Sequence, residues 1–305
     1  MNKNFDIIIV GSGPAGLTSA IYASRANKSV LVIEKEAFGG MITHSPKVEN
    51  YPGYESISGL DLADKFVAQA MALGVMFEFD EVKGIEKSIE GFLVKCENSE
   101  FIAKSVIIAS GSKHRKLNLD NEDKLTGKGI SYCAVCDGAF YKGQEVVIFG
   151  GGNSAMQEAI LLSSYCPKVT MIQNLPYLTG EDSLVKAINK NEKINVIYNH
   201  IVVELLGEDS LKGIVLQNVD TKENTVFDTN SVFVCIGQVS DNEPFKNVCL
   251  LNNQGFIISD ELCSTNVEGI FVAGDCKDKK IRQIVTATSD GSIAALQAIK
   301  YIDKK

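Results

Sequence analysis

The N-terminal stretch up to Glu34 carries the pattern that most restricts how this chain can fold. Phe5–Val10 is a short apolar, β-branched run that predicts a buried parallel strand. It leads directly into the glycine-rich turn Gly11–Gly16, an Ala-rich helical stretch and a second apolar strand at Val30–Ile33. Strand, glycine-rich turn, helix and strand in this order form a βαβ unit. The pattern therefore predicts an α/β fold built on a parallel sheet.

The glycine-rich turn has the GxGxxG spacing of a dinucleotide-binding fingerprint. Gly11 permits the tight turn, Gly13 lets the backbone approach a pyrophosphate, and Gly16 lets the helix pack closely on the strand. The following helix start offers free amide groups to phosphates. Glu34 stands about 20 residues further on, where a carboxylate usually holds ribose hydroxyls. We therefore predict dinucleotide binding; a glycine-rich turn in an empty Rossmann-like fold is the alternative.

A second unit of the same kind begins at Glu145. Glu145–Phe149 predicts another buried strand, which runs into the GxGxxA turn Gly150–Ala155, a helix through Leu162 and the strand Lys168–Ile172. In both units the chain then continues in short strand-like runs, from Val75 to Val106 and from Asn195 to Asn218, which we interpret as antiparallel meanders. A buried strand follows each meander. The same order of elements is thus repeated along the chain.

The C-terminal part contains no third fingerprint. Gly255–Ile258 and Gly269–Ala273 are strand-like, and Ile284–Tyr301 predicts a last helix. These elements most simply complete the first domain, so the second domain is an insertion. We expect two Rossmann-like dinucleotide-binding domains with three-layer parallel sheets and β-meander inserts. The expected boundaries are 1–115 with 242–305 for the first domain, and 116–241 for the inserted one, with a polar linker at 118–129.

Between the two fingerprints lies Cys133-Ala134-Val135-Cys136-Asp137-Gly138. A structural zinc site would need two further ligands, but no second CxxC occurs and the three histidines are scattered. A chance pair of cysteines is a second alternative. A redox dithiol is the interpretation we favour, because CxxC spacing lowers a thiol pKa and supports a reducible disulfide. Asp137 could exchange a proton with a thiol, although Asp-Gly is also a common turn pair.

Composition excludes several other classes of protein. The net charge of −8 argues against a nucleic-acid binder. Eight cysteines in 305 residues are too sparse for a disulfide scaffold. Neither a signal peptide nor a run of about 20 apolar residues is found, so we expect a cytoplasmic protein without a membrane span or a metal site. The six cysteines outside the CxxC are interpreted as small buried side chains, with Cys276 the one nearest a cofactor.

The order of the motifs GSGPAG, GGMITHSPKVENYPG, CAVCDG, GGGNSA and AGDC…RQ…TA resembles the low-molecular-weight bacterial thioredoxin reductases over nearly the whole chain. The resemblance implies a homodimeric FAD enzyme that reduces thioredoxin. Cys136 would face the flavin, Cys133 would attack the protein disulfide, and Asp137 would be the general acid/base. The FAD-binding residues that it implies are Gly11, Ser12, Gly13, Pro14, Ala15, Gly16, Glu34, Lys35, Gly39, Gly40, Met41, Ile42, Asn50, Val82, Ala109, Gly111, Asp275, Arg282, Gln283 and Ile284.

The electron donor is where the sequence departs from this family. Members that use NADPH carry a basic HRRxxxR run after the second strand of the inserted domain, where this chain has 173–179, QNLPYLT. Without Arg or Lys partners for the 2′-phosphate, NADPH is disfavoured. A ferredoxin-type carrier ranks first and NADH second, since Gln173 and Asn174 could partly replace the usual acid. The residues that argue for keeping a nicotinamide site are Gly150, Gly152, Asn153, Ser154, Ala155 and Glu158.

Two alternatives to thioredoxin reduction, and one hypothesis on docking, stay open from the sequence. The chain could be a non-enzymatic FAD-binding redox sensor, or it could reduce another small disulfide protein instead of thioredoxin. Two basic clusters, Lys113–Lys116 and Lys277–Arg282, suggest a docking surface for an acidic electron carrier. Ordinary solvated lysines are the alternative for both clusters.

Overall fold

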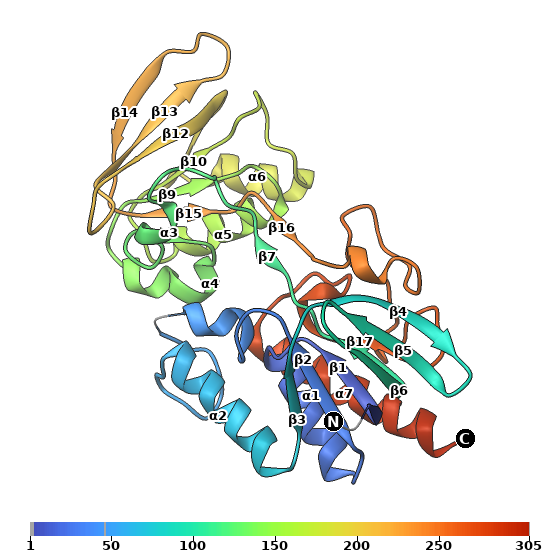
Figure 1. Ribbon diagram of the computed structural model, residues 1–305. Coiled ribbons are helices and arrows are strands. Elements are labelled where there is room, and N and C mark those ends of the chain that lie inside the picture. Colours follow the sequence, from blue (N-terminus) through green and yellow to red (C-terminus); the bar gives the residue numbers. More distant parts are fainter. Residues whose placement is uncertain (1–2, 46, 305) are drawn as a thin grey trace. The chain divides into compact units, whose positions relative to one another are not determined.

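The computed structural model describes residues 3–45 and 47–304. The chain forms two compact units, of which unit 1 comprises residues 1–113 and 239–305, and unit 2 comprises residues 114–238 (Figure 1). These boundaries lie within three residues of the expected ones. The two segments that connect the units, β7 (Lys113–His114) and β16 (Gln238–Val239), form a two-stranded sheet.

Unit 1 is organised around one seven-stranded sheet with the order β3-β2-β1-β6-β5-β4, and β17 pairs with β6. Its parallel part brings β1 beside β2 and β6, with Ile8 opposite both Leu31 and Val106. The strands are β1 (Asn4–Val10), β2 (Val30–Glu34), β3 (Met76–Phe79), β4 (Val82–Ser88), β5 (Gly91–Cys96), β6 (Glu100–Ile108) and β17 (Ile270–Val272).

Three expectations for this unit were wrong. β3 is parallel to β2 and extends the main sheet, so only β4, β5 and the start of β6 form an antiparallel meander. β6 is one continuous strand, because its first residues pair with β5 while its later residues lie between β1 and β17. Residues 255–258 form no strand; Ile257 makes only isolated bridges, to Leu251 and Lys277.

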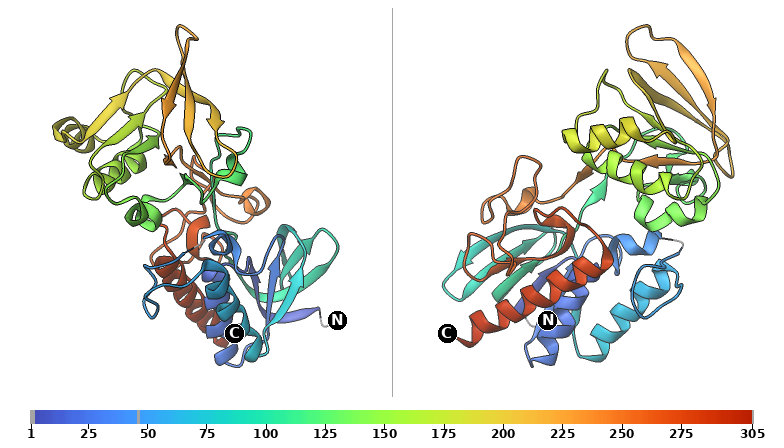
Figure 2. Two further views of the ribbon diagram at one scale, coloured as in Figure 1. Left: turned by 90° about the vertical axis from the view of Figure 1, so that its left-hand side faces the viewer. Right: turned by 180° about the vertical axis from the view of Figure 1, so that it is seen from behind.

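The helices α1 (Pro14–Arg25) and α7 (Ile284–Asp303) pack against each other along one face of this sheet, as both views of Figure 2 show. Their contact depends on small residues: a Cβ at Gly291 would stand 2.2 Å from the carbonyl oxygen of Ala15. α2 (Gly59–Ala72) also packs against α1. Short 3₁₀ turns are η1 (Gly40–His44), η3 (Glu243–Phe245) and η4 (Gly274–Cys276). The other face of the sheet is covered by the meander, whose Ile85, Phe92 and Val94 are buried.

Unit 2 contains a five-stranded parallel sheet with the order β11-β10-β9-β15-β8, and a separate antiparallel sheet, β12-β13-β14. The parallel strands are β8 (Ile130–Ser131), β9 (Val146–Phe149), β10 (Val169–Ile172), β11 (Ile194–Ile197) and β15 (Val232–Val234). The antiparallel strands are β12 (His200–Leu206), β13 (Gly213–Asn218) and β14 (Asn224–Asp228). The helical elements are α3 (Glu122–Leu125), α4 (Ala134–Asp137), η2 (Gly138–Tyr141), α5 (Asn153–Ser163) and α6 (Asp182–Lys190).

Unit 2 corrects two further expectations. β11 is parallel to β10 and is therefore part of the main sheet, not of the meander. The polar stretch 118–129 is no linker, because it contains α3, with Leu125 fully buried and Glu122 also buried. The Glu122 carboxylate accepts hydrogen bonds from the amides of Leu117 and Asn118, both at 2.8 Å, which explains why this polar segment is ordered. None of the helices in the described part of the chain combines the length and apolar character needed to cross a bilayer.

Candidate functional site

The glycines of the first fingerprint are required by close packing at the end of β1. Gly11 has a φ of +100°, and a Cβ there would stand 2.3 Å from the carbonyl oxygen of Ala109. A Cβ at Gly16 would stand 1.9 Å from the carbonyl oxygen of Gly11. Gly13 is different, since nothing lies within 4 Å of its Cβ position. Space therefore lies open at Gly13, the N-cap of α1, where no side chain caps the helix. An anion such as a pyrophosphate fits this arrangement.

Glu34 is tied to the same turn at the end of β2. Its Oε2 accepts hydrogen bonds from the amide and the hydroxyl of Ser12, both at 2.8 Å. Its Oε1 accepts from the amides of Lys35 and Glu36, each at 2.9 Å. Gly39 donates its amide to the Ser12 carbonyl, which brings the loop after β2 against the fingerprint. A Cβ at the next residue, Gly40, would stand 2.9 Å from the Cα of Gly13.

The C-terminal segment contributes the carboxyl group of Asp275, which is buried with one oxygen unpaired. The turn η4 lies against the start of α1, because a Cβ at Gly274 would stand 2.8 Å from the Cβ of Ala15. Asp275 follows, and its Oδ1 is buried without a hydrogen-bond partner. Burial raises the pKa of Asp275 to about 6, and nearby Lys279 and Arg282 offset part of that rise. A buried acceptor without a donor is costly, so this oxygen fits a hydroxyl group of a bound ligand.

Three further expected residues are held around the same region. Arg282 donates to the Asp275 carbonyl at 3.2 Å, and its guanidinium lies 4.2 Å from the centre of the Phe256 ring. Gln283 accepts a hydrogen bond of 3.2 Å from the side chain of Asn50. Ile284 packs against the small apolar cluster that contains Ile42. The loop after β2 and the C-terminal segment are therefore joined, as binding of one cofactor by both would require.

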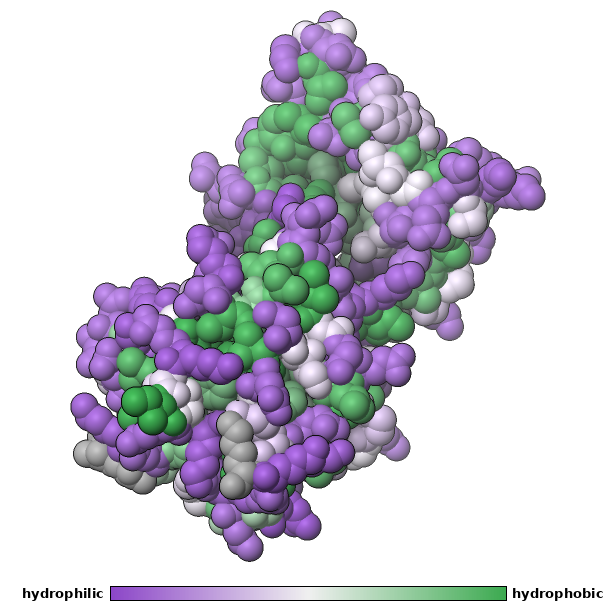
Figure 3. All heavy atoms as spheres, turned by 90° about the vertical axis from the view of Figure 1, so that its right-hand side faces the viewer, coloured by the Kyte–Doolittle hydropathy of each residue, from purple (hydrophilic) through white to green (hydrophobic). Residues whose placement is uncertain are grey.

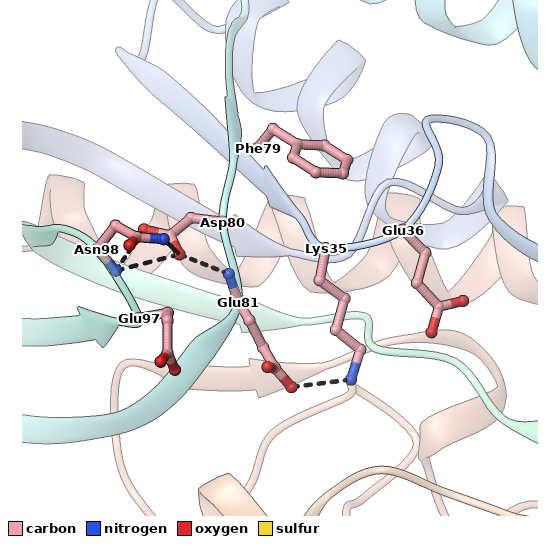
Figure 4. Close-up of a pocket in the computed structure, with 7 residues that line it drawn as sticks. All are labelled: Lys35, Glu36, Phe79, Asp80, Glu81, Glu97 and Asn98. Atoms are coloured by element: carbon pink, nitrogen blue, oxygen red, sulfur yellow. Dashed lines mark hydrogen bonds and ion pairs between the residues drawn. The ribbon is translucent and has the colours of Figure 1, made fainter.

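The remaining expected residues contact this region less directly. Val82 is buried in the core of unit 1, and Met41 is largely exposed. Ala109 and Gly111 follow β6, with Gly111 in an open position at a φ of +72°. Lys35 lines a cavity of about 410 Å³ at the ends of β2 and β3 (Figure 4). The other lining residues are Glu36, Phe79, Asp80, Glu81, Glu97 and Asn98.

The carboxylates that line this cavity disfavour the binding of a phosphate group. The Lys35 ammonium pairs with Glu81 at 3.2 Å and also with Asp241. Burial works to lower the pKa of Lys35, but these two carboxylates raise it overall. Asp80 accepts hydrogen bonds from Ser99 and from the amides of Glu81 and Asn98. Lys35 is therefore already neutralised by this chain's own carboxylates.

The first site as a whole fits FAD. It offers an uncapped helix start with open space at Gly13, a carboxylate at the end of β2 and an unpartnered buried acceptor at Asp275. The residues that would hold the cofactor are the Gly11–Gly16 turn, Glu34, the Gly39–Gly40 pair, Asn50 and Asp275.

The second fingerprint repeats the first with different side chains. Gly150 donates its amide to the Ile172 carbonyl just as Gly11 donates to Ile33, so Gln173 stands where Glu34 stands in unit 1. The Gln173 side chain is buried, and its amide nitrogen donates to the Tyr177 carbonyl at 3.1 Å. It covers the turn so closely that a Cβ at Gly151 would stand 2.5 Å from it.

The start of α5 also differs from the start of α1. The amide of Glu181 donates to the Asn153 side-chain oxygen at 2.7 Å, and the Asn153 amide group donates back to the Glu181 carboxylate at 3.3 Å. A Cβ at Gly180 would stand 2.4 Å from the same Asn153 oxygen. A carboxylate therefore stands at a helix start where a phosphate would need positive charge. Ser154 is exposed, while Ala155 packs in the core of unit 2.

The redox turn is a disulfide between Cys133 and Cys136, at the start of the short helix α4. The amide of Cys136 donates to the Cys133 sulfur at 3.2 Å. Beside it, the Ser131 hydroxyl donates to Asp137 at 2.6 Å and accepts from the amide of Cys133 at 3.2 Å. Burial raises the pKa of Asp137, and the Ser131 hydrogen bond partly opposes this. A carboxyl group with a raised pKa in the same turn as two sulfurs is suited to deliver and accept protons.

Glu158 and Cys235 form a contact that the sequence did not suggest. The Glu158 carboxylate accepts hydrogen bonds from the amide of Ala134 and from the thiol of Cys235, both at 3.0 Å. Glu158 therefore lies against the redox turn. Ser131 and Cys235 were both missed as site residues; the one available signal was that each follows or ends a parallel strand, where sites commonly form.

The cysteines and lysines outside the redox turn mostly have structural contacts. Cys166, Cys249, Cys263 and Cys276 are buried, while Cys96 and Cys235 are half-buried. The docking surface suggested at Lys277–Arg282 was wrong in part. Lys277 is buried, with Asp290 at 3.8 Å, and Lys279 pairs with the same carboxylate at 2.6 Å. Across residues 3–45 and 47–304, no group of three or more His, Cys, Asp and Glu is placed to hold a metal ion.

Comparisons with known proteins agree with this geometry. The family model for pyridine nucleotide-disulphide oxidoreductases matches residues 5–291. Thioredoxin reductase of Bacillus subtilis is 41% identical over 303 residues, which cover 99% of this chain and 96% of that protein. The crystal structure of thioredoxin reductase from Streptococcus pyogenes matches with a TM-score of 0.94 and 37% identity, covering all of both chains.

A further solved relative bears a different description. The ferredoxin-flavin thioredoxin reductase from Clostridium acetobutylicum is 32% identical, with a TM-score of 0.54, over 99% of this chain and 98% of that one. Together, the two fingerprints, the disulfide turn and these matches lead to one assignment. The chain belongs to the pyridine nucleotide-disulphide oxidoreductase family and, within it, to the low-molecular-weight thioredoxin reductases, which are flavoprotein oxidoreductases.

Proposed function

We propose that this protein reduces the disulfide of a thioredoxin-like protein, using electrons from a ferredoxin-type carrier and not from NADPH. FAD, when bound in unit 1, supplies the electrons that convert the Cys133–Cys136 disulfide to a dithiol. Unit 1 carries the proposed FAD site, and unit 2 carries the redox turn. The observation that carries the donor part of the proposal is the second fingerprint, where Gln173 and Glu181 stand in place of phosphate-binding groups.

The contacts of the redox turn support distinct roles for the two cysteines. The Cys136 amide donates to the Cys133 sulfur, which stabilises a thiolate at Cys133 and favours it as the attacking group. That thiolate attacks one substrate sulfur, forms a mixed disulfide and releases the other substrate sulfur as a thiol. Cys136 then attacks Cys133, which restores the enzyme disulfide and releases the second substrate thiol. Asp137 exchanges the protons that these steps require.

Exposed apolar side chains support a protein as the substrate and a second copy of the chain as a partner. Val135, inside the redox turn, and Phe140, shortly after it, are both exposed, which favours contact with a protein surface. In unit 1, hydrophobic residues gather between hydrophilic ones on the face that Figure 3 shows. The large apolar residues exposed in its C-terminal part are Val239, Leu250, Ile258, Leu262, Ile281, Val285 and Leu296. We infer a homodimer, which light scattering during gel filtration would test.

The donor proposal depends on charge. A nucleotide 2′-phosphate carries about two negative charges, and each Arg or Lys contact to it contributes about 1.5–3 kcal/mol. The segment 173–181 contains no such residue, and it places the Glu181 carboxylate at the start of α5. NADH avoids the 2′-phosphate, but its ribose hydroxyls are usually held by a carboxylate at this strand end. This chain has the neutral Gln173 there, whose side chain is buried and held by the bond that its amide nitrogen donates to Tyr177. A ferredoxin-type carrier needs neither group, and one solved relative is described as a ferredoxin-flavin thioredoxin reductase.

Anaerobic reduction of the bound flavin separates the three donors. Holoprotein is mixed in parallel with NADPH, NADH and reduced ferredoxin, and loss of flavin absorbance is followed, with thioredoxin added in a second series. We expect rapid bleaching and thioredoxin reduction with ferredoxin, and slow or no bleaching with either nicotinamide. Rapid, full bleaching by micromolar NADPH would refute the donor assignment, whereas bleaching without thioredoxin reduction would refute the substrate assignment.

A further inference from the structure

The carboxylate of Glu158 in unit 2 links three elements next to the redox turn. Glu158 lies in α5, and its Oε2 accepts from the amide of Ala134, the first residue of α4. The same oxygen accepts from the thiol of Cys235, just after β15. Both donors are 3.0 Å away. The position of α4 relative to the parallel sheet therefore depends directly on this side chain.

Ser131 is a second anchor of the turn. Ser131 holds the amide of Cys133 at 3.2 Å and donates to Asp137 at 2.6 Å. The amides of Cys133 and Ala134 are consecutive, so the Ser131 hydroxyl and the Glu158 carboxylate fix two neighbouring peptide groups. Losing either anchor frees one end of the segment that carries the disulfide.

The charge at Glu158 is sensitive to its surroundings. Burial raises its pKa, the hydrogen bonds from Cys235 and Ala134 lower it, and the negative charge of Asp137 raises it further. Burial and the adjacent Glu158 together raise the pKa of Cys235 well above the ordinary thiol value. Cys235 is thus a thiol that donates to the carboxylate and stays protonated.

We propose that Glu158 is a positioning residue that sets the reduction potential of the Cys133–Cys136 disulfide, with Cys235 as its hydrogen-bond donor. The oxidised turn is neutral, whereas the reduced turn carries negative charge when Cys133 is a thiolate. A nearby carboxylate disfavours that charge and therefore favours the disulfide. The inference rests on the proposed redox role of this disulfide, but its test uses neither thioredoxin nor any of the three donors compared in the flavin experiment.

The test is a thiol–disulfide equilibrium with the holoprotein. Wild type and variants are equilibrated anaerobically in oxidised and reduced dithiothreitol, and the Cys133–Cys136 disulfide is quantified by peptide-resolved thiol labelling. Glu158→Gln keeps the acceptor oxygen and removes the charge. We expect it to shift the equilibrium about tenfold toward the dithiol, which is about 30 mV for a two-electron couple. Glu208→Gln is the matched control, because Glu208 is an exposed acid in the same unit.

Two further variants separate charge from position. Glu158→Asp keeps the charge but withdraws the carboxylate from Ala134, and it also covers the case in which Glu158→Gln fails to fold. It should shift the equilibrium through loss of the anchor alone. In a Cys235→Ala background the Glu158→Gln shift should be smaller, because the two residues act through one oxygen.

Two results would overturn the inference. One is a Glu158→Gln equilibrium indistinguishable from that of Glu208→Gln. The other is a Glu158→Gln shift that is the same with and without Cys235, which would remove Cys235 from the proposal. A failure of thioredoxin reduction in the flavin experiment would leave this equilibrium unaffected, so the two proposals fail separately.

Discussion

Replacing Asp290 by Asn should destabilise the turn that carries Asp275. Asp290 lies in α7 and is only slightly exposed. Its Oδ2 accepts from Lys279 at 2.6 Å and from the amide of Gly274 at 3.1 Å, and its Oδ1 lies 3.8 Å from the Lys277 ammonium. One carboxylate therefore neutralises two sheltered lysines and fixes the start of η4.

The expected loss of stability follows from the burial of these charges. Removing one partner of a buried ion pair costs about 3–5 kcal/mol, because the remaining charge is left uncompensated. Glu243→Gln provides the contrast, since Glu243 and Lys246 form an exposed pair, with 71% and 64% of their side chains accessible. Exposed pairs contribute about 0–1 kcal/mol. Both substitutions remove one negative charge from unit 1.

Hydrogen exchange measured by mass spectrometry is the suitable assay, because a two-unit protein need not unfold in a single step. Peptides from α7 and from residues 270–280 should exchange much faster in the Asp290→Asn variant and almost normally in Glu243→Gln. Adding Lys279→Met to Asp290→Asn should restore part of the protection, because it removes one unpaired ammonium. Equal protection in Asp290→Asn and Glu243→Gln would refute the idea that Asp290 holds this turn.

Three other substitutions have defined outcomes. Cys136→Ser should keep FAD yet lose thioredoxin reduction, and full turnover would exclude the exchange mechanism. Asp137→Asn should slow turnover by about 10²–10⁴-fold without loss of flavin, because it removes a general acid/base; normal rates across the pH range would assign Asp137 to the turn alone. Asp275→Asn should weaken FAD binding yet stabilise the FAD-free protein. Burial raises the folded-state pKa of Asp275 to about 6. Ionisation of Asp275 therefore lowers the free energy of unfolding as the pH rises from about 4 to 6. Above pH 6 the loss amounts to about 3 kcal/mol. The gain should therefore be seen in denaturation at about pH 7.5 and vanish near pH 4.

The sequence was most informative where structure depends on neighbouring residues. The two strand–turn–helix fingerprints were found at their positions, because apolar runs, glycine spacing and helix starts are local properties. The CxxC pair and the acid beside it were found for the same reason. Strand direction was not local: β3 and β11 read as meander strands, yet each joins its sheet in parallel. A short alternating strand has the same sequence pattern in both cases, and its partner is chosen by the fold.

The charged side chains show more clearly what the sequence could not predict. Lys277 and Lys279 look like a solvated basic cluster in the sequence, but tertiary packing buries Lys277, largely covers Lys279 and gives both to Asp290 on α7. Glu158 belongs to a fingerprint helix by sequence, but packing turns it toward Ala134 and Cys235. The sequence alone determined which chemical groups are present, namely two dinucleotide-type turns, a dithiol and an acid. These groups are recognised from residue types that lie close together in the chain. Only the tertiary structure decided which carboxylate faces which partner, because burial and pairing join residues that are far apart in the chain.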